Sequence, residues 1–219
     1  ADTFGACNGD LEKEIYTEGI YVGYRYFDSF DIQPLFPFGY GLSYTEFSVE
    51  FEGVEADAHA VRVAVKVSNI GGLYTGREVV QVYAACPQNG GAKEYRRLVG
   101  FAKTQQLGPG ETQCVTIAVD AKQLASFSQE KQAWILEQGV YTLFVGNSSV
   151  NCKPCAHLKV ETEKVLERTH PICPVQHPFE ELKCAAPAME KAALATQMKL
   201  PCVRFNPEPE EKAQAAIVP

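Results

Sequence analysis

The sequence predicts a mainly β protein, built on an antiparallel β-sandwich at residues 46–150 with an irregular or helical C-terminal tail. Short apolar segments recur there at strand length, and some of them alternate with a period of two. Turn residues separate these segments, and no amphipathic helix lies between them. This combination is typical of an antiparallel sandwich. Residues 1–45 are aromatic and turn-rich, and residues 151–219 shift to Cys, Pro, Glu, Lys and Ala.

The first strong strand pattern is AVRVAVKVSN, residues 60–69. It places four valines on one face, at positions 61, 63, 65 and 67, with Arg62 and Lys66 on the other, as in a half-buried strand. The turn segment NIGGLYTG, residues 69–76, follows it. The next strand is predicted at REVVQVYAAC, residues 77–86, which is apolar on both faces.

Further strands are predicted on both sides of a short crossover. In the turn LGPGET, residues 107–112, Pro109 presets φ and Gly110 tolerates a positive φ. QCVTIAVD, residues 113–120, then alternates again, and DAKQLASFSQ, residues 120–129, is expected to be a crossover loop with a short helical turn. Two more strands are expected in WILEQGVYTLFVGNSS, residues 134–149, around the turn Glu137–Gly139.

The tail from residue 151 to 219 is expected to be mostly irregular. PAMEKAALATQMK, residues 187–199, is rich in good helix formers and predicts a helix of about three turns. NPEPEEKAQAAIVP, residues 206–219, is acidic and has little to bury, which is typical of a linker or a disordered end.

Composition excludes some classes of function. The formal charge of −7 argues against a nucleic-acid partner, which needs a basic face. No apolar run approaches the roughly 20 residues that cross a bilayer, so no membrane partner is expected. The first ten residues, ADTFGACNGD, lack both Met and the features of a signal peptide, and we expect the chain to be a fragment.

The chain has eight cysteines, at positions 7, 86, 114, 152, 155, 173, 184 and 202. This even number permits a disulfide framework, but the sequence alone cannot decide which cysteines pair. Cys86 and Cys114 lie in strand patterns, where a reduced cysteine is a small apolar residue expected to be buried. Because no export signal is in view, we expect reduced thiols and a cytoplasmic setting. A secreted or periplasmic setting is the alternative.

The segment CKPCAH, residues 152–157, contains half of a tetrahedral zinc site. No second pair follows at a familiar spacing, although His170, Cys173, His177 and Cys184 come later in the chain. A structural zinc and a disulfide at Cys152 and Cys155 remain open beside unligated thiols. The prediction is that the chain holds no metal and no cofactor.

No nucleophile elbow, zinc-protease motif or phosphate-binding loop is present. Glu18, Asp28 and Asp31 cluster near an aromatic segment, and glycoside hydrolysis needs two carboxylates. The favoured interpretation is that these side chains cap turns and pair with Arg25. We therefore nominate no catalytic residue, and substrate-binding residues stay unknown.

The aromatic segment is PLFPFGYGLSYTEF, residues 34–47, in which five aromatic residues alternate with Pro and Gly. Its rings are those of Phe36, Phe38, Tyr40, Tyr44 and Phe47. They are suited either to stacking on sugars or to pinning the chain between two modules. Packing is favoured, because each fully buried Phe stabilises by about 1.5–3 kcal/mol.

Two N-terminal segments, YTEGIYVGYRYFD (residues 16–28) and residues 34–47, closely resemble the end of the α/β sandwich domain in glycoside hydrolase family 3, the β-glucosidases and their relatives. Three later segments resemble the fibronectin type III-like module that follows it in that family: REVVQVY (77–83), RRLVGFAKTQQLGPGET (96–112) and WILEQGVYTLFVGNSS (134–149). One departure is Gln138, where the family often has Pro. The resemblance implies that residues 1–45 end an α/β sandwich domain, that 46–150 form the module, and that 151–219 are an extension or a linker to a further domain, such as a barrel placed after the module.

The resemblance also implies a retaining mechanism whose Asp nucleophile sits on a barrel and whose Glu acid/base comes from earlier in the α/β sandwich domain. Neither region is expected here: the only Trp is Trp134, outside the motif that carries the nucleophile, and residues 1–45 are too short for the sandwich domain. We therefore expect a non-catalytic portion of the enzyme whose partners are the barrel and sandwich domains, and which meets a β-glucoside only through them. The alternatives are a carbohydrate-binding module, a chain that completes an active site with a partner chain, and a structural spacer.

Overall fold

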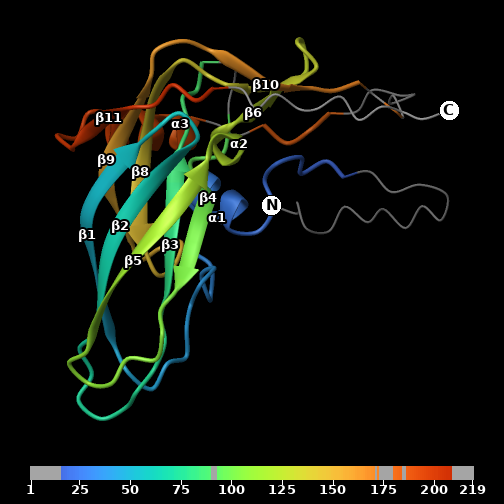
Figure 1. Ribbon diagram of the computed structural model, residues 1–219. Helices are drawn as coiled ribbons and strands as arrows, with labels where there is room; N and C mark the ends of the chain where they lie inside the picture. The colour runs from blue at the N-terminus through green and yellow to red at the C-terminus, as the bar shows by residue number, and fades with distance from the viewer. Residues whose placement is uncertain (1–15, 90–92, 171, 173–179, 184–185, 209–219) are drawn as a thin grey trace, which may run out of the picture.

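The computed structural model describes residues 16–89, 93–170, 172, 180–183 and 186–208. Two sheets pack face to face, one with the strand order β1-β2-β5 and the other with the order β11-β9-β8-β3-β4 (Figure 1). A third, small sheet has the order β10-β7-β6. The strands are β1 (Phe47–Ala56), β2 (Ala60–Asn69), β3 (Val79–Ala85), β4 (Arg97–Lys103), β5 (Thr112–Asp120), β6 (Ser126–Ser128), β7 (Ala133–Leu136), β8 (Gly139–Gly146), β9 (Cys152–Val160), β10 (Lys164–Arg168) and β11 (Cys202–Arg204). The helices are α1 (Tyr24–Phe30), α2 (Ala121–Leu124) and α3 (Ala186–Thr196).

The antiparallel sandwich predicted from the sequence is confirmed. In β2 the four alternating valines are fully buried, and β5 faces the same core with Val115, Ile117 and Val119. The predicted short helical turn after β5 is α2, where the Asp120 carboxylate accepts a hydrogen bond from the amide of Lys122. The apolar period of two therefore marks the strands that bury only one face.

Strand β3 is apolar on both faces because it lies between two clusters of buried side chains. Val80, Val82 and Ala84 face the main core between the sheets. Tyr83 and Ala85 face the other way, into a smaller cluster with Phe144 and residues of α3. The outer face of this sheet is thus covered by other parts of the chain.

The turn Glu137–Gly139 carries the chain from β7 in the small sheet to β8 in the five-stranded sheet. Gly139 adopts a φ of 144° there, which favours glycine. Tyr141 fixes the turn, because its hydroxyl donates to the carbonyl of Glu137 (3.1 Å) and accepts from the amide of the same residue (2.9 Å). This contact resembles the tyrosine corner of immunoglobulin-like sandwiches.

The expectation of a mostly irregular tail is wrong for the part of it that the structure describes. Strand β9 completes the sheet beside β8, β10 joins the small sheet, and β11 pairs in parallel with β9. The sequence hides β9 because most of its second half is buried on both faces, which removes the alternation. Strand β11 has only three residues and is too short to recognise. The predicted helix is confirmed as α3.

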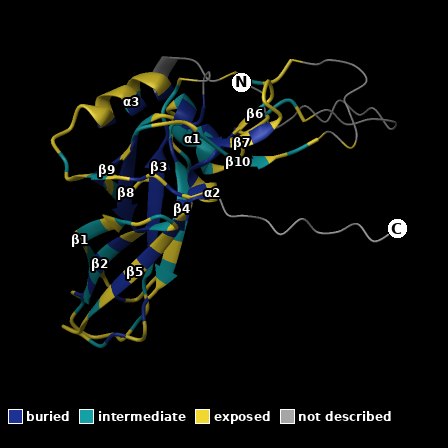
Figure 2. Cartoon of the chain, turned by 45° about the horizontal axis from the view of Figure 1, so that its top comes forward, coloured by how far each residue is buried: buried dark blue, intermediate teal, exposed yellow. Residues whose placement is uncertain are grey.

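Helix α3 covers the outer face of the five-stranded sheet and lies next to α1 (Figure 2). From residue 188 onward its buried side chains are the small ones of Ala188, Ala192 and Ala195, which let the helix backbone approach the sheet closely. No helix in the described part of the chain is long and apolar enough to cross a membrane. The proposed linker is described only to residue 208, and its remainder, 209–219, lies outside the described residues.

Candidate functional site

Two of the three carboxylates that the sequence placed near the aromatic segment, those of Asp28 and Asp31, form ion pairs, but not with Arg25. Asp28, on α1, lies 2.8 Å from Nε of Arg96, and Asp31 lies 2.5 Å from Nζ of Lys191 on α3. Asp31 also caps α1 in a left-handed conformation with φ 58°. The prediction that these side chains pair with cations is confirmed for Asp28 and Asp31, whereas the expected partner, Arg25, is wrong. The cap at Asp31 is made by its backbone amide, which donates to the carbonyl of Phe27, and for Glu18 the prediction stays a prediction. The true partners are far away in sequence.

Arg96 is the centre of a buried cluster just before β4. Its Nε donates to Asp28, one terminal nitrogen donates to Sγ of Cys152 (2.9 Å), and the other donates to the carbonyl of Ser149. Its guanidinium also lies 5.1–5.6 Å from the ring centroids of Tyr83, Tyr95 and Phe144. A planar cation that donates several hydrogen bonds and stacks on aromatic faces is the role in which Arg excels.

This cluster fastens residues 16–46, which we call the connector, to the outer face of the five-stranded sheet. The Tyr24 hydroxyl accepts from the amide of Leu98 (2.7 Å), and the Ser29 hydroxyl accepts from the amide of Tyr95 (3.0 Å). From the other side, Nζ of Lys191 reaches the carbonyl of Asp28 (3.3 Å). Helix α1 is therefore held between β4 and α3.

The aromatic segment is only partly packed. Phe47 packs against the main core, and the Phe38 ring contacts Tyr24 at 5.2 Å between centroids although it remains 48% exposed. Phe36, Tyr40 and Tyr44 are 65%, 53% and 89% exposed. The packing interpretation therefore holds for Phe47 and in part for Phe38, and the other three rings lie largely in solvent.

Gly39 shows how closely the connector lies on the sheet. Its φ is 86°, and a Cβ atom at this position would lie 2.8 Å from the carbonyl oxygen of Asn147. The adjacent carbonyl of Phe38 accepts from the amide of Ser149 (2.8 Å). Glycine is required here because the positive φ strains other residues and because a Cβ atom would collide with the Asn147 carbonyl.

Sequence reasoning missed Asn69, the residue that organises the lower end of the sandwich. Its side chain is fully buried and uses all four of its hydrogen-bonding positions. The Oδ1 atom accepts from the Thr45 hydroxyl (2.6 Å) and the Gly71 amide (3.1 Å), while Nδ2 donates to the carbonyls of Tyr74 and Leu107, both at 2.9 Å. No sequence pattern marks it, because its partners are brought together only by folding.

The cysteine and histidine residues of CKPCAH point into different environments. Cys152 lies in the cluster around Tyr83, whereas Cys155 is buried in the main core, on the other face of the sheet. The His157 ring lies 3.2 Å from the Thr142 hydroxyl and 3.0 Å from the carbonyl of Met198. Among the described residues no group of three or more His, Cys, Asp or Glu side chains is placed to hold a metal ion. Cys173, His177 and Cys184 lie outside the described residues.

Cys86 is buried as expected, but the expectation that Cys114 is buried is wrong, because its side chain points outward from the edge strand β5. Burial raises the pKa of the Cys86 and Cys152 thiols to about 11 and that of Cys155 to about 12. A thiol with such a pKa is almost entirely protonated at neutral pH and reacts slowly.

We expect iodoacetamide at pH 8 to alkylate Cys114 and Cys202 in the folded protein and to spare Cys86 and Cys155. Unfolding in guanidinium should expose all four, and peptide mass spectrometry reads each site.

The raised pKa of the buried thiols also predicts a dependence of stability on pH. The Cys86 thiol keeps its proton up to about pH 11 in the folded protein, whereas the same thiol loses it near pH 9 in the unfolded chain. Stability should therefore fall as the pH rises from about 9 to 11, and equal urea midpoints at pH 8 and 10.5 would contradict this.

Two hollows lie in the described part of the chain, and the larger one, of about 290 Å³, is lined by Gln138, Gly139, Val140, Lys159, Val160 and Glu161. A cavity of about 40 Å³ is lined by His59, Asp120, Lys122, Leu166 and Glu208, among others. The smaller volume is far below the roughly 300 Å³ or more of pockets that enclose small molecules, and the larger hollow has only one carboxylate in its lining, that of Glu161, whereas glycoside hydrolysis needs two. Asp120 in the smaller cavity is the N-cap of α2. The prominent surface features are instead the anchored connector and its exposed rings.

Comparison with known proteins agrees with this geometry. The family model of the fibronectin type III-like domain matches residues 78–149. A β-glucosidase from Ruminococcus albus is 40% identical over 177 residues, which is 78% of this chain and 18% of that protein. β-Glucosidase A from Butyrivibrio fibrisolvens is 43% identical over 155 residues, covering 61% of this chain and 19% of that one.

Solved structures give the same result. A β-glucosidase from Paenibacillus barengoltzii superposes with a TM-score of 0.75 at 35% identity, over 82% of this chain and 21% of that chain. β-Glucosidase 3B from Thermotoga neapolitana gives a TM-score of 0.69 at 36% identity, and the match covers 76% of this chain and 23% of that chain. The chain spans about a fifth of the length of the curated relatives it matches. Sequence and fold thus relate this chain to the glycoside hydrolase family 3 β-glucosidases, of which it matches one segment, the part that holds their fibronectin type III-like domain.

Proposed function

We propose that this chain is the non-catalytic accessory portion of a family 3 glycoside hydrolase of the β-glucosidase type. The observation that carries the proposal is coverage: the chain matches about a fifth of each relative, and this fifth contains the fibronectin type III-like domain. The carboxylates of the connector support it, because Asp28 and Asp31 are occupied in ion pairs with Arg96 and Lys191. A retaining pair of carboxylates would face each other across a sugar, about 5 Å apart.

The partners in this proposal are the barrel and α/β sandwich domains of the same enzyme, and a β-glucoside is met only through them. We also propose a cytoplasmic setting with reduced thiols. Such a setting would keep as thiols the five cysteines that are free in the described part, at positions 86, 114, 152, 155 and 202.

We expect the isolated chain to show no turnover of an aryl β-glucoside above the buffer background. The Ruminococcus albus β-glucosidase, assayed at equal molar concentration, is the positive control. Turnover by the isolated chain would contradict the non-catalytic assignment. Turnover that arises only after mixing with the remaining domains of the enzyme would favour the alternative in which the chain completes an active site.

A further inference from the structure

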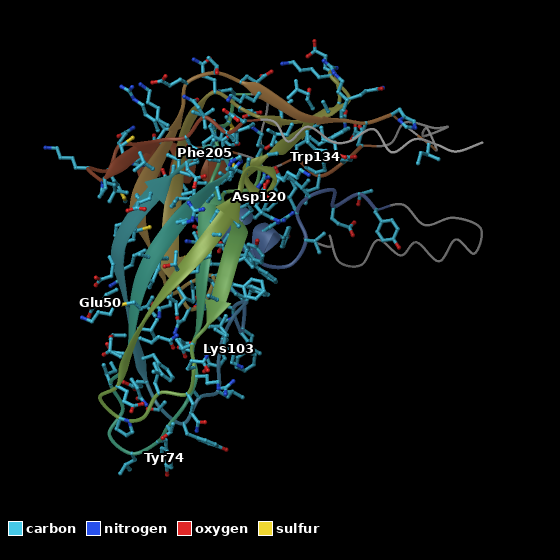
Figure 3. All side chains as sticks on the ribbon, in the orientation of Figure 1. Glu50, Tyr74, Lys103, Asp120, Trp134 and Phe205 are labelled. Carbon is cyan, nitrogen blue, oxygen red and sulfur yellow. The ribbon has the colours of Figure 1, made fainter. Side chains whose placement is uncertain are left out.

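The connector runs from α1 to the lower end of the sandwich (Figure 1), and it carries several of the most exposed large apolar side chains of the described part. Leu35, Leu42 and Tyr44 are 85–89% exposed, and Phe36 and Tyr40 lie beside them. The loop between β2 and β3 adds Ile70, Leu73 and Tyr74, and Tyr74 marks the lower tip in Figure 3. We call residues 35–44 and 70–74 together the aromatic strip.

The aromatic strip carries no charge. No Asp, Glu, Lys or Arg occurs between Asp31 and Glu46, or between Lys66 and Arg77. A solvent-exposed surface normally mixes apolar and charged residues, and contiguous apolar patches mark sites of interaction. Enrichment in aromatic residues with depletion of charges is the composition of the core of a protein–protein interface.

The aromatic strip is also held in a fixed shape before any partner binds. Asn69 joins its two parts, because its buried amide bonds both Thr45, at the end of the connector, and the backbone of Gly71 and Tyr74 in the loop. The rings of Tyr44 and Tyr74 lie 6.0 Å apart, and those of Phe36 and Tyr40 lie 5.2 Å apart. Preorganisation of this kind lowers the entropy cost of docking.

We propose that the aromatic strip is the docking surface for the rest of the same enzyme, an inference that rests on the proposed function above. The relatives are about five times as long as this chain, so most of the protein that would cover its surface lies outside the structure. The match to the solved β-glucosidase covers 82% of this chain and so extends well beyond residues 78–149. A sugar site would need polar groups converging between the rings, whereas the aromatic strip is uncharged and apolar.

The test compares one substitution in two settings, the isolated chain and the full-length enzyme that contains it. Leu42→Glu places a charge on the aromatic strip at a side chain that is 85% exposed. The matched control is Leu194→Glu, on the outer face of α3, where the side chain is 61% exposed. Melting temperatures are measured by calorimetry for the wild type and both variants in each setting.

We expect Leu42→Glu to leave the Tm of the isolated chain within about 2 °C, since exposed positions tolerate change. In the full-length enzyme the same change should lower the Tm of this portion by about 5 °C or more, because docking would bury the carboxylate. Leu194→Glu should be neutral in both settings. A Tm unchanged in the full-length enzyme, or lowered as much by the control, would overturn the proposal.

Two further outcomes identify a different occupant. Cello-oligosaccharides are titrated into the isolated chain while Tyr and Trp134 fluorescence is followed. Saturable binding abolished by Tyr44→Ala would make the strip a sugar platform. Light scattering at increasing concentration detects a dimer, and a dimer abolished by Leu42→Glu, with the full-length enzyme unaffected, would assign the strip to a second copy. Neither melting nor scattering depends on which glycoside the enzyme cleaves, so the accessory role and the docking surface can fail separately.

Discussion

Replacing Asp28 with Asn is expected to destabilise the isolated chain by about 3–5 kcal/mol, which would lower its Tm by about 10 °C. The Asp28 and Arg96 side chains are only 12% and 9% exposed. The substitution preserves the shape of residue 28 but leaves the guanidinium without its carboxylate in a site enclosed by three aromatic rings. An uncompensated charge in such a place costs far more than the ion pair contributes.

The matched control removes one charge from an exposed pair. Glu163 lies beside Lys131, and their side chains are 38% and 43% exposed, so Glu163→Gln should cost no more than about 1 kcal/mol. The double variant with Arg96→Met should recover part of the loss, because no charge then remains unpaired. Urea unfolding measures all four proteins. Equal losses from Asp28→Asn and Glu163→Gln would show that the cluster around Arg96 does not hold the connector.

Replacing Phe205 with Ala is the second change with a large expected effect, again about 3–5 kcal/mol. Phe205 directly follows β11 and its side chain is fully buried in the main core, although it lies in the part of the chain expected to be irregular (Figure 3). Its amide donates to the carbonyl of Lys159 (3.0 Å), which joins it to β9. The substitution leaves a cavity in the centre of the sandwich and loosens the strand that covers the edge of β9.

Phe101→Ala is the control for this change, because Phe101 lies on β4 with its side chain 68% exposed. Phe101→Ala should change the free energy of unfolding by no more than about 0.5 kcal/mol, the usual range for surface positions. Thermal unfolding in the isolated chain compares the two variants. If Phe205→Ala proved as mild as Phe101→Ala, residues 202–205 would not be an integral part of the sandwich.

These two residues show why residues 46–150 alone do not describe the folded unit. The connector reaches the sheet through Asp28, and the tail reaches the core through Phe205. Helix α3, also in the tail, lies against α1 and β8, with Lys191 pairing with Asp31. The chain on either side of the fibronectin type III-like domain is therefore built into the same structure.

The sequence by itself determined the elements whose signal is local. The valines of β2 and the alternation in β5 follow from a period of two, α3 follows from helix propensity, and the turn at Pro109–Gly110 follows from turn chemistry. Each depends only on residues within about ten positions of one another. The family resemblance added the order of these elements.

Only the tertiary structure decided which distant residues meet. Arg96 rather than Arg25 pairs with Asp28 because β4 passes beneath α1, and Asn69 joins residues 45, 71, 74 and 107 because the sandwich closes there. Strand β9 was not predicted because burial on both faces removes the alternation of apolar and polar residues. Strand β11 was not predicted because it has only three residues. The exposure of the aromatic strip is likewise a tertiary outcome: the same rings would suit a core, and only the fold shows that they face solvent.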